Sequence, residues 1–294
     1  SRLFEDAGIA KVPFDQNPDI YVLNTCSVTE NADKKCKQLV RKAKRMNAEC
    51  FIVIIGCFAQ LKPIEIGEIE GVDMVLGANE KFNIIEHLEK ISLNPINQTH
   101  IAYENIKNTK EFIPSFSIGD RTRSFLKIQD GCDYPCTYCT IPLARGKSRY
   151  DSIENIIKNA ENIAVNGIKE IVLTGVNIGE FIDINTKNNF YDLIKKLEKV
   201  EGIQRYRISS IEPNLITNDI IDFVKKSNKF MPHFHIPMQS GSDAILGKMK
   251  RRYNSTVYGN KVQAIIKAIP NVCIGADVIV GFPGETEQEF GKTL

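Results

Sequence analysis

The segment "CFIVIIGC" (Cys50–Cys57) decides the fold class of the first part of the chain. Its interior is almost entirely apolar and rich in β-branched residues, which is the composition of a parallel strand buried on both faces. The charged segment Glu30–Arg45 has helical periodicity, and the short apolar run Asp19–Cys26 precedes it. Another strand and helix fit between residues 72 and 90. Alternating strands and helices of this kind predict an α/β sandwich domain over residues 1–91.

A second alternating series occupies residues 124–294, after a polar, weakly periodic stretch at 92–123 that predicts a linker. Five strands separated by helices predict a partial (β/α) barrel. The strands fit at Phe125–Gln129, Glu170–Thr174, Arg205–Ser209, His233–Pro237 and Val272–Val280. The helices fit at Ser152–Val165, Tyr191–Val200, Asn218–Lys226 and Thr256–Ala268. Both ends of the chain run into helical patterns, so we expect a fragment that is truncated at both ends.

The composition limits the class of protein. Hydrophobic residues make up 43% of the 294 residues, and 38 Lys and Arg against 36 Asp and Glu give a net charge of +2, so any basic surface must be local. No stretch approaches the roughly 20 apolar residues of a membrane span, and the start does not resemble a signal peptide. The chain has eight cysteines, and the close spacing of three of them in a sequence without a signal peptide predicts metal ligation in a reducing cytoplasm rather than disulfides.

The segment "DGCDYPCTYCTIPLARGKSR" (Asp130–Arg149) follows the first barrel strand and places Cys132, Cys136 and Cys139 close together. Structural zinc requires four ligands, and no fourth cysteine or histidine follows nearby. Three thiolates instead suit a [4Fe–4S] cluster with one iron left open. We therefore favour an iron–sulfur cluster over zinc or unliganded thiols.

The other predicted barrel strands also end in small, polar or Gly-rich loops: "TGVNIGEF", "SSIEPN", "MQSGS" and "GFPGET". Turn formation alone explains any single one of these loops. In (β/α) barrels, however, the chemistry lies on the loops after the carboxyl ends of the strands. Five such loops, with a cysteine cluster on the first, predict a functional site.

Cys132, Cys136 and Cys139, with Tyr138 just before the last cysteine, resemble the signature of the radical S-adenosylmethionine enzymes. The flanking residues are similar to those of the methylthiotransferases, which add a methylthio group to tRNA or to a ribosomal protein. The resemblance continues in "NTCSVTENADKK", "IIGCFAQ", "SSIEP", "QSGSDAILGKMKRRY" and "GFPGET", and covers nearly the whole chain apart from the linker.

This resemblance implies a mechanism. The open iron holds the amino and carboxylate groups of S-adenosylmethionine, and an electron from the cluster cleaves the sulfonium to give a 5′-deoxyadenosyl radical, which removes a hydrogen from an unactivated C–H bond. Turn formation or capping is the alternative role for each polar residue in the strand-end loops. The cofactor-binding residues that the resemblance implies, besides Tyr138, are Thr174, Gly175, Asn177, Ser209, Glu212, Gln239 and Ser240.

Cys26 and Cys57 each end a predicted strand, so in a parallel sheet they would emerge at the same edge. The resemblance implies a second [4Fe–4S] cluster here, held by three cysteines and bearing the sulfur that is transferred. By this resemblance its third cysteine would lie upstream of this sequence, and we expect the site to be one ligand short. Cys50 cannot share this site because about seven strand residues, roughly 23 Å, separate it from Cys57. For Cys36, Cys50 and Cys273 we favour a structural role as buried free cysteines.

Two basic segments, "ARGKSR" (144–149) and "KMKRRY" (248–253), lie near the predicted cysteine site. Local basic clusters on a nearly neutral chain suit a polyanion, because phosphate neutralisation dominates such affinity. A solvated charged surface is the alternative. The candidate RNA contacts are Arg145, Lys147, Arg149, Arg251 and Arg252.

Within the family, the motifs most resemble the branch that modifies carbon 2 of N6-threonylcarbamoyladenosine next to the tRNA anticodon. Methylthiolation of N6-isopentenyladenosine in tRNA, or of an aspartate in a ribosomal protein, is the alternative reaction, and an iron–sulfur RNA-binding protein is the non-enzyme alternative. The resemblance implies tRNA and S-adenosylmethionine as partners, an electron donor such as flavodoxin or ferredoxin, a sulfur source, and an RNA-binding domain beyond residue 294.

Overall fold

The chain forms two compact units in a computed structural model. The first comprises Ser1–Lys110 and Cys139–Lys147, and the second comprises Glu111–Tyr138 and Ser148–Leu294. The structure describes residues 2–25, 30–93, 98–117 and 122–294. No helix in these ranges is both long enough and apolar enough to span a membrane.

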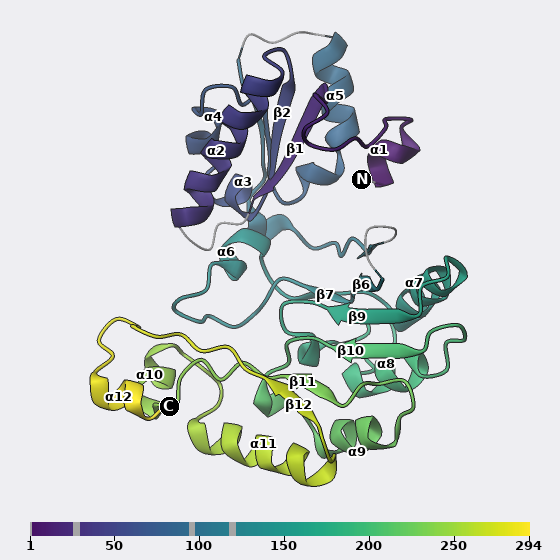
Figure 1. Cartoon of the computed structure of the whole chain (residues 1–294), viewed down its shortest axis with the longest axis vertical. Helices are drawn as coiled ribbons and strands as arrows, with labels where there is room; N and C mark the ends of the chain where they lie inside the picture. The colour runs from purple at the N-terminus through teal and green to yellow at the C-terminus, as the bar shows by residue number, and fades with distance from the viewer. Residues whose placement is uncertain (1, 26–29, 94–97, 118–121) are drawn as a thin grey trace. The chain divides into compact units, whose positions relative to one another are not determined.

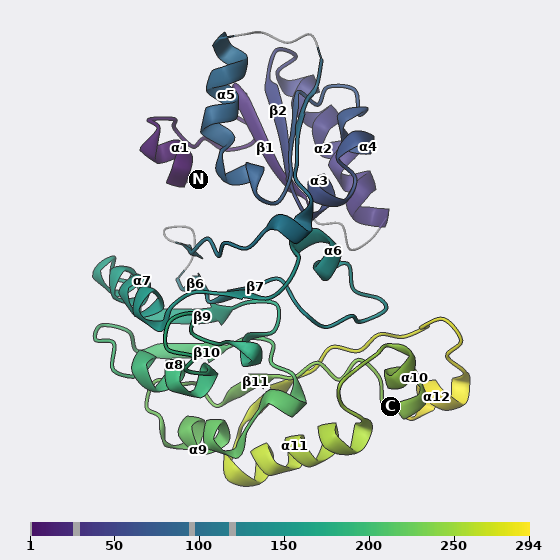
Figure 2. The same cartoon turned by 180° about the vertical axis from the view of Figure 1, so that it is seen from behind.

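The first unit is a three-layer α/β sandwich, as predicted. Its four parallel strands are arranged in the order β1-β2-β3-β4. Helices α2, α3 and α4 pack on one face and α5 packs on the other, with α1 beside it (Figures 1 and 2). The elements are α1 (Arg2–Asp6), β1 (Ile20–Thr25), α2 (Glu30–Met46), β2 (Phe51–Gly56), α3 (Cys57–Leu61), α4 (Pro63–Gly67), β3 (Met74–Leu76), η1 (Glu80–Phe82), α5 (Ile84–Leu93) and β4 (His100–Ala102).

Strand β2 shows why its sequence is apolar throughout. Successive side chains of a strand point to opposite faces of the sheet. Ile52 and Ile54 enter the core under α2 and α3, whereas Val53 between them enters the core under α5. Since helices cover both faces, neither side of this strand can be polar.

The predicted linker, residues 92–123, contains three short elements. It contributes β4 to the first sheet, η2 (Ile106–Asn108), and β5 (Ser115–Phe116), which pairs antiparallel with β6 of the second unit. Both strands are at the edge of their sheets, and the residues of β4 are only half-buried. Edge strands of this kind do not need the apolar run that identifies a buried strand, so the sequence pattern missed them.

The second unit is an open array of parallel strands. Strands β6, β9 and β10 form one parallel sheet, β11 and β12 form another parallel pair, and an isolated bridge between Ser210 and His235 connects the two groups. Within the described ranges these strands do not close into a barrel. The strands are β6 (Ser124–Lys127), β7 (Gln129–Asp130), β8 (Arg149–Tyr150), β9 (Glu170–Thr174), β10 (Arg205–Ile208), β11 (His233–His235) and β12 (Cys273–Gly275).

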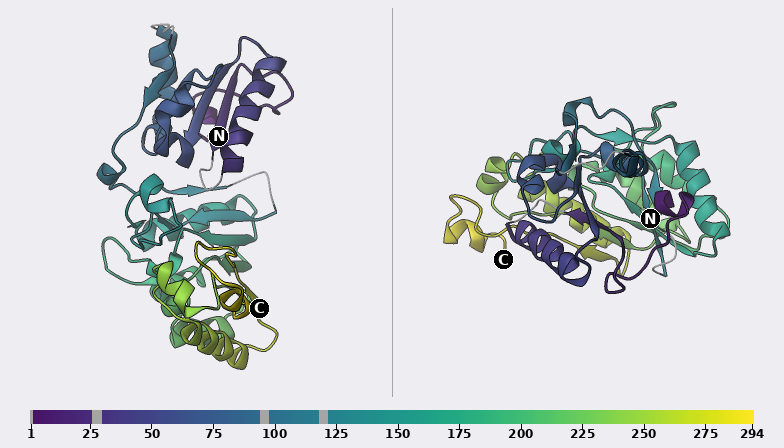
Figure 3. Two further views of the ribbon diagram at one scale, coloured as in Figure 1. Left: turned by 90° about the vertical axis from the view of Figure 1, so that its left-hand side faces the viewer. Right: turned by 90° about the horizontal axis from the view of Figure 1, so that it is seen from above.

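Four amphipathic helices cover this array and share one apolar core with its strands. The longest of them, α11, runs along one side of the unit (Figure 3). The helices of the second unit are α7 (Ile153–Val165), η3 (Ile178–Glu180), α8 (Phe190–Leu197), η4 (Pro213–Leu215), α9 (Asn218–Lys226), α10 (Asp243–Lys248), α11 (Ser255–Ala268) and α12 (Glu287–Gly291), and α6 (Ile141–Arg145) belongs to the first unit.

The last predicted strand is much shorter than expected. Only Cys273–Gly275 of the predicted Val272–Val280 pairs as a strand, and its partner is β11. Among the described residues β12 has no neighbour on its other side, and Val280 is 60% exposed. Cys273 is exposed as well, so the prediction that it is buried was wrong.

Candidate active site

The candidate active site of the second unit consists of four loops that follow the carboxyl ends of β6, β9, β10 and β11. We call them the strand-end loops: residues 128–138, 174–177, 209–212 and 237–242. Since the four strands are parallel and adjacent in the array, their carboxyl ends lie at one edge. All of these residues belong to the second unit.

Gln129 joins the first two strand-end loops. Its side-chain oxygen accepts hydrogen bonds from the backbone N–H groups of Val176 (2.7 Å) and Asn177 (3.1 Å), and its amide nitrogen donates to the Gly131 carbonyl (2.7 Å). A Cβ on Gly175 would lie 2.8 Å from the same side-chain oxygen. Gly175 therefore leaves room for Gln129, which is a packing role that the sequence did not indicate.

Cys132 and Cys136 are each 9% exposed, and each sulfur accepts a hydrogen bond. The backbone N–H of Tyr134 donates to Cys132 Sγ over 3.4 Å, and Arg251 Nη1 donates to Cys136 Sγ over 3.1 Å. Hydrogen bonds to sulfur and low solvent exposure are the features by which proteins tune iron–sulfur clusters. These two thiols are therefore in a setting that fits cluster ligands.

The cysteine loop is also attached to the carboxyl end of α10. The backbone N–H of Thr137 donates to the Met249 carbonyl over 3.3 Å, and its hydroxyl donates to the Lys248 carbonyl over 3.0 Å. Thr137 lies next to Cys136, so this attachment limits the movement of that cysteine.

Cys139 is half-buried and lies in the segment Cys139–Lys147, which groups with the first unit. Its closeness to Cys136 therefore follows from the sequence alone, in which two residues separate them. No three His, Cys, Asp or Glu side chains of the described residues are gathered as ligands of a metal ion. The joint role of Cys132, Cys136 and Cys139 accordingly stays a prediction.

Arg251 and Glu212 form a buried ion pair beside Cys136. Their side chains are 5% and 9% exposed, and Arg251 Nη2 donates to Glu212 Oε1. Burial alone lowers the pKa of Arg251, but Glu212, Tyr253, Tyr138 and Cys136 together outweigh it, so this pKa is raised and the guanidinium stays charged. Burial raises the pKa of Glu212, and Arg251 offsets part of that effect.

Several buried polar atoms in the strand-end loops have no hydrogen-bond partner among the described residues. They are Asn177 Oδ1 and Nδ2, Ser209 Oγ, Glu212 Oε2 and Ser242 Oγ. A buried polar atom without a partner costs free energy, so such atoms usually belong to a ligand site or contact ordered water. The strand-end loops thus present donors and acceptors that fit the amino, carboxylate and hydroxyl groups of S-adenosylmethionine.

The other predicted cofactor residues have partners within the protein. The Thr174 carbonyl accepts from the backbone N–H of Ile128, and the Gln239 N–H donates to the Asp277 carbonyl. The Ser240 hydroxyl accepts from the backbone N–H of Ser242 over 3.1 Å. Tyr138 accepts from Arg251 Nη1 over 3.0 Å. Their role in cofactor binding stays a prediction.

The predicted RNA contacts fall into two groups. Lys147 and Arg252 are exposed, and Arg145 is half-buried. The Arg149 side chain is only 9% exposed and lies 3.7 Å from Asp130 Oδ2. Arg149 and Arg251 therefore do not fit the prediction of exposed phosphate contacts, because each guanidinium is itself largely buried and already lies beside a carboxylate.

Arg252 lies over the ring of Tyr134. The centre of its guanidinium is 3.7 Å from the ring centroid, and its side chain is 50% exposed. Glu180 Oε1 lies 4.0 Å from Arg252 Nη1. A planar cation stacked on an aromatic ring keeps its orientation while it remains open to a second contact.

In the first unit, only one of the two predicted ligands of the second cluster lies among the described residues. Cys26 lies outside the described residues. Cys57 is half-buried and is the first residue of α3, directly after Gly56, which pairs with Thr25 of β1. Cys36 lies on α2, and its side chain and that of Cys50 are buried in the same core, which confirms their predicted structural role; burial raises the pKa of the Cys50 thiol.

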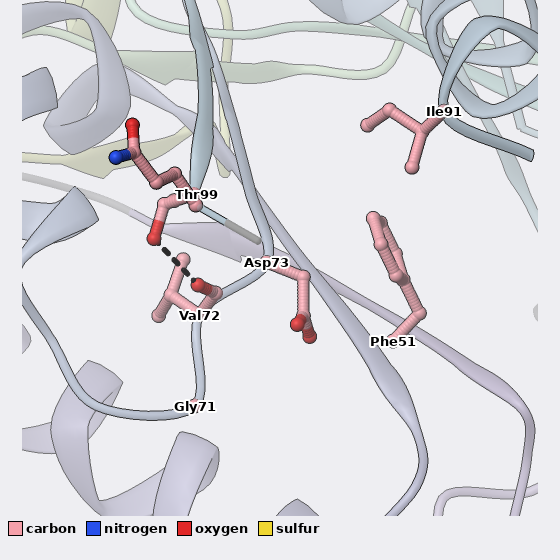
Figure 4. A pocket seen from close by; sticks show the side chains of 7 residues that line it. Phe51, Gly71, Val72, Asp73, Ile91 and Thr99 are labelled. Atoms are coloured by element: carbon pink, nitrogen blue, oxygen red, sulfur yellow. Dashed lines mark hydrogen bonds between the residues drawn. The ribbon is translucent and has the colours of Figure 1, made fainter. Parts of the chain in front are cut away.

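A pocket of about 320 Å³ lies at the opposite end of this sheet from Cys57 (Figure 4). The Asp73 side chain in its wall accepts from the Ile52 N–H over 2.8 Å and lies 3.4 Å from Lys44 Nζ. The Thr99 hydroxyl is 3.0 Å from the Val72 carbonyl. Asp73 and Thr99 therefore already have protein partners, and their contacts do not indicate a second functional site in this pocket.

Sequence reasoning missed Gln129, Tyr134 and the buried position of Arg251. A polar residue at the end of an apolar strand was the available signal for Gln129. Nothing in the pair Arg251–Arg252 indicates which arginine is buried, because the distinction depends on how α10 packs.

Comparisons with known proteins support the family. Residues 126–294 match the model of the Radical SAM superfamily, and residues 1–77 match Uncharacterized protein family UPF0004. The chain is 41% identical to threonylcarbamoyladenosine tRNA methylthiotransferase MtaB of Bacillus subtilis (strain 168), over 99% of this chain and 65% of that protein. It is 36% identical to the protein of the same name from Aquifex aeolicus (strain VF5), over 99% of this chain and 70% of that protein.

A solved structure supports the fold. The radical S-adenosylmethionine methyltransferase TsrM from Kitasatospora setae resembles this chain with a TM-score of 0.66 at 13% identity, over 92% of this chain and 58% of that one. At this identity the likeness concerns the fold alone. The cysteine motif, the parallel array and the matches over nearly the whole sequence agree. The chain belongs to the radical SAM superfamily and, within it, to the methylthiotransferase family.

Proposed function

We propose that this chain is part of an enzyme that adds a methylthio group to carbon 2 of N6-threonylcarbamoyladenosine next to the tRNA anticodon. The observation that carries this proposal is the 41% identity, over nearly all of this chain, to a protein named for that tRNA nucleoside. The chain spans 65% of the length of that relative, so the substrate and activity of the whole protein are part of the proposal.

Cys132, Cys136 and Cys139 would hold a [4Fe–4S] cluster, and Asn177, Ser209 and Glu212 would contact S-adenosylmethionine. When bound, the cluster and S-adenosylmethionine supply the one-electron chemistry that removes hydrogen from an unactivated C–H bond. The support for these ligands is the burial of Cys132 and Cys136 and the buried polar atoms that have no partner among the described residues.

The residues around this site orient and shield it. Gln129 fixes the position of the loop after β9 through two backbone N–H groups. Thr137 attaches the cysteine loop to the end of α10. The exclusion of water by buried neighbours such as Tyr134, which is 2% exposed, would protect reactive species from side reactions.

The tRNA would be held by exposed basic residues. Lys147, Lys248, Lys250 and Arg252 are exposed, and Arg145 is half-buried. Exposed Lys and Arg contact RNA mainly through phosphate, and the contribution of each is reduced by salt. The planar guanidinium of Arg252, stacked on Tyr134, could also meet a phosphate with two parallel hydrogen bonds.

The sulfur would come from a second [4Fe–4S] cluster held by Cys26, Cys57 and a third cysteine of the longer protein. An external sulfur source and an electron donor such as flavodoxin or ferredoxin would complete the reaction, which we place in the cytoplasm. Support for this second site is limited to the position of Cys57 directly after the carboxyl end of β2.

The test is mass analysis of tRNA nucleosides. A strain that lacks the gene should lose 2-methylthio-N6-threonylcarbamoyladenosine and keep the unmethylthiolated nucleoside, and the full-length protein should restore the product. Loss of 2-methylthio-N6-isopentenyladenosine instead would assign the other tRNA substrate. Unchanged tRNA with an altered ribosomal protein would assign the protein substrate, and no change in either would favour a binding protein without catalysis.

A further inference from the structure

Arg251 connects three segments that are far apart in the sequence. Its guanidinium donates to Cys136 Sγ, 115 residues away, and to the Tyr138 hydroxyl, and it pairs with Glu212 in the loop after β10. The neighbouring Lys250 has a φ of +57°, which turns the chain after α10 and brings Arg251 inward. The Arg251 side chain is 5% exposed, whereas the Arg252 side chain is 50% exposed.

The fork of the guanidinium suits this arrangement. One terminal nitrogen serves the sulfur and the phenol, and the other serves the carboxylate. A lysine ammonium carries the same charge, but it is a point donor on a flexible stem and lacks the fixed planar fork. Arg251 therefore determines where Cys136 lies relative to the loop after β10.

The two charges near Cys136, on Arg251 and Glu212, have opposite effects on the reduction potential of a cluster. A cation and an N–H···S hydrogen bond stabilise the more negative, reduced state of an iron–sulfur cluster and so raise its reduction potential. A buried carboxylate has the opposite effect. Glu212 contacts the same guanidinium, so it offsets part of the positive charge that Arg251 presents to the sulfur.

We propose that Arg251 is a positioning residue that holds Cys136 and raises the reduction potential of the cluster, and that Glu212 limits this rise. This inference rests on the proposed function only in requiring a cluster at Cys132, Cys136 and Cys139. It predicts shifts of opposite sign when the two partners are changed separately. A purely structural role would not give opposite shifts.

The experiment is a redox titration followed by electron paramagnetic resonance. All samples are the full-length protein carrying Cys26→Ala and Cys57→Ala, so that one cluster remains, and are reconstituted anaerobically with iron and sulfide. The variants are Arg251→Met, Arg251→Lys and Glu212→Gln. The matched control is Arg252→Met, which changes the adjacent, half-exposed arginine.

Arg251→Met should lower the equilibrium constant for one-electron reduction about tenfold, which corresponds to a midpoint lower by about 59 mV. Glu212→Gln should shift the midpoint upward, because it keeps an oxygen acceptor and removes the negative charge. Arg251→Lys should lie between wild type and Arg251→Met. Arg252→Met should change the constant by less than about threefold, because water and salt screen an exposed charge.

Arg251→Met leaves the Glu212 carboxylate buried without its cation, which is destabilising. The double variant Arg251→Met/Glu212→Gln removes both charges, and its midpoint should lie below that of Glu212→Gln alone. Equal midpoints for these two proteins, or a downward shift in Glu212→Gln, would overturn the proposal. If the parent protein binds no iron at all, the proposed cluster itself is wrong, and iron analysis separates that outcome from a failure of this inference.

Discussion

Both units carry cysteines just after the carboxyl ends of parallel strands, but the surroundings of these cysteines differ. In the second unit, Cys132 and Cys136 each accept a hydrogen bond, and the loops after β9 and β10 hold buried polar atoms that have no partner among the described residues. In the first unit, Cys57 follows Gly56, whose φ is +107°, and a Cβ there would collide with the Thr25 carbonyl oxygen. Among the described residues of the first unit, only the Thr109 hydroxyl is a buried side-chain atom without a partner.

The difference separates two ways of presenting a cysteine. The second unit surrounds its thiols with polar side chains that can contact a bound organic molecule. The first unit places Cys57 directly after Gly56, whose positive φ and close approach to β1 leave no room for a Cβ. We therefore expect changes in the two units to affect different steps of the reaction.

The largest expected effect is at Cys136. Cys136→Ala in the full-length protein should reduce formation of 5′-deoxyadenosine from S-adenosylmethionine to background, since the three-cysteine site loses a ligand. Cys36→Ala is the control, because Cys36 lies on α2 with its side chain in the core, and its loss should cost only about 1 kcal/mol of unfolding free energy. Normal 5′-deoxyadenosine formation by Cys136→Ala would contradict the radical mechanism.

Cys57→Ala should separate the two steps. We expect it to keep 5′-deoxyadenosine formation and to lose the methylthiolated nucleoside, because the proposed second cluster supplies sulfur and takes no part in cleaving the cofactor. Both products can be measured in one reaction by mass spectrometry. A wild-type yield of methylthiolated nucleoside would show that Cys57 is not a ligand of the sulfur-bearing cluster.

Asp183 should matter for stability in the second unit. Its carboxylate accepts from the backbone N–H groups of Ile153 (2.6 Å), Asn185 (2.7 Å) and Thr186 (2.7 Å). Asp183→Ala leaves these donors without an acceptor and should cost about 2–4 kcal/mol in urea unfolding. Asp192→Ala, which removes a half-buried member of a capping box, should cost about 1 kcal/mol. Equal losses would show that burial of the acceptor is unimportant.

Asp183 should also make stability depend on acidity. Burial alone would raise its pKa, but the three backbone N–H groups hold it below its usual range. Since the folded-state pKa is lower than the unfolded-state value of about 3.9, the stabilisation is complete above that pH and is lost as the pH falls through the folded-state pKa. Asp183→Asn should lose this part of the acid dependence, and urea unfolding below pH 4 measures it.

The smallest expected effect is at the exposed basic residues. Arg252→Ala should weaken tRNA binding about two- to tenfold and reduce the slope of log affinity against log salt by about 1, as expected for one lost phosphate contact. Lys195→Ala is the control, because Lys195 is not a predicted RNA contact and its charge is already paired with Asp192 on α8. An unchanged salt slope in Arg252→Ala would mean that this residue does not contact phosphate.

The regular elements of the second unit were predictable because their patterns are local. Strand β9 and helix α9 have the predicted bounds, and the caps of α7 and α9, Ser152 and Thr217, accept from backbone N–H groups three residues later. The β4 edge strand and the shortness of β12 depend on which neighbours are present, so no local pattern identifies them.

The loops of the candidate site were predictable from the sequence, but the hydrogen bonds and ion pairs between their side chains were not. Motif spacing identified Cys132 and Cys136, and both lie after the carboxyl ends of the strands. The opposite environments of Arg251 and Arg252 could not be predicted, because adjacent residues of one type differ only in what packs around them. For the same reason, the sequence could not show that Gln129 connects two loops 47 residues apart.

The segment Cys139–Lys147 belongs to the first unit although residues of the second unit precede and follow it. The ribosome therefore does not complete the first unit before it begins the second. The first unit has all of its described parts only after residue 147 has left the ribosomal tunnel, when Glu111–Tyr138 of the second unit is already made. For the same reason, no single proteolytic cut can release either unit whole, and one of the cuts required falls between Tyr138 and Cys139, inside the cysteine motif.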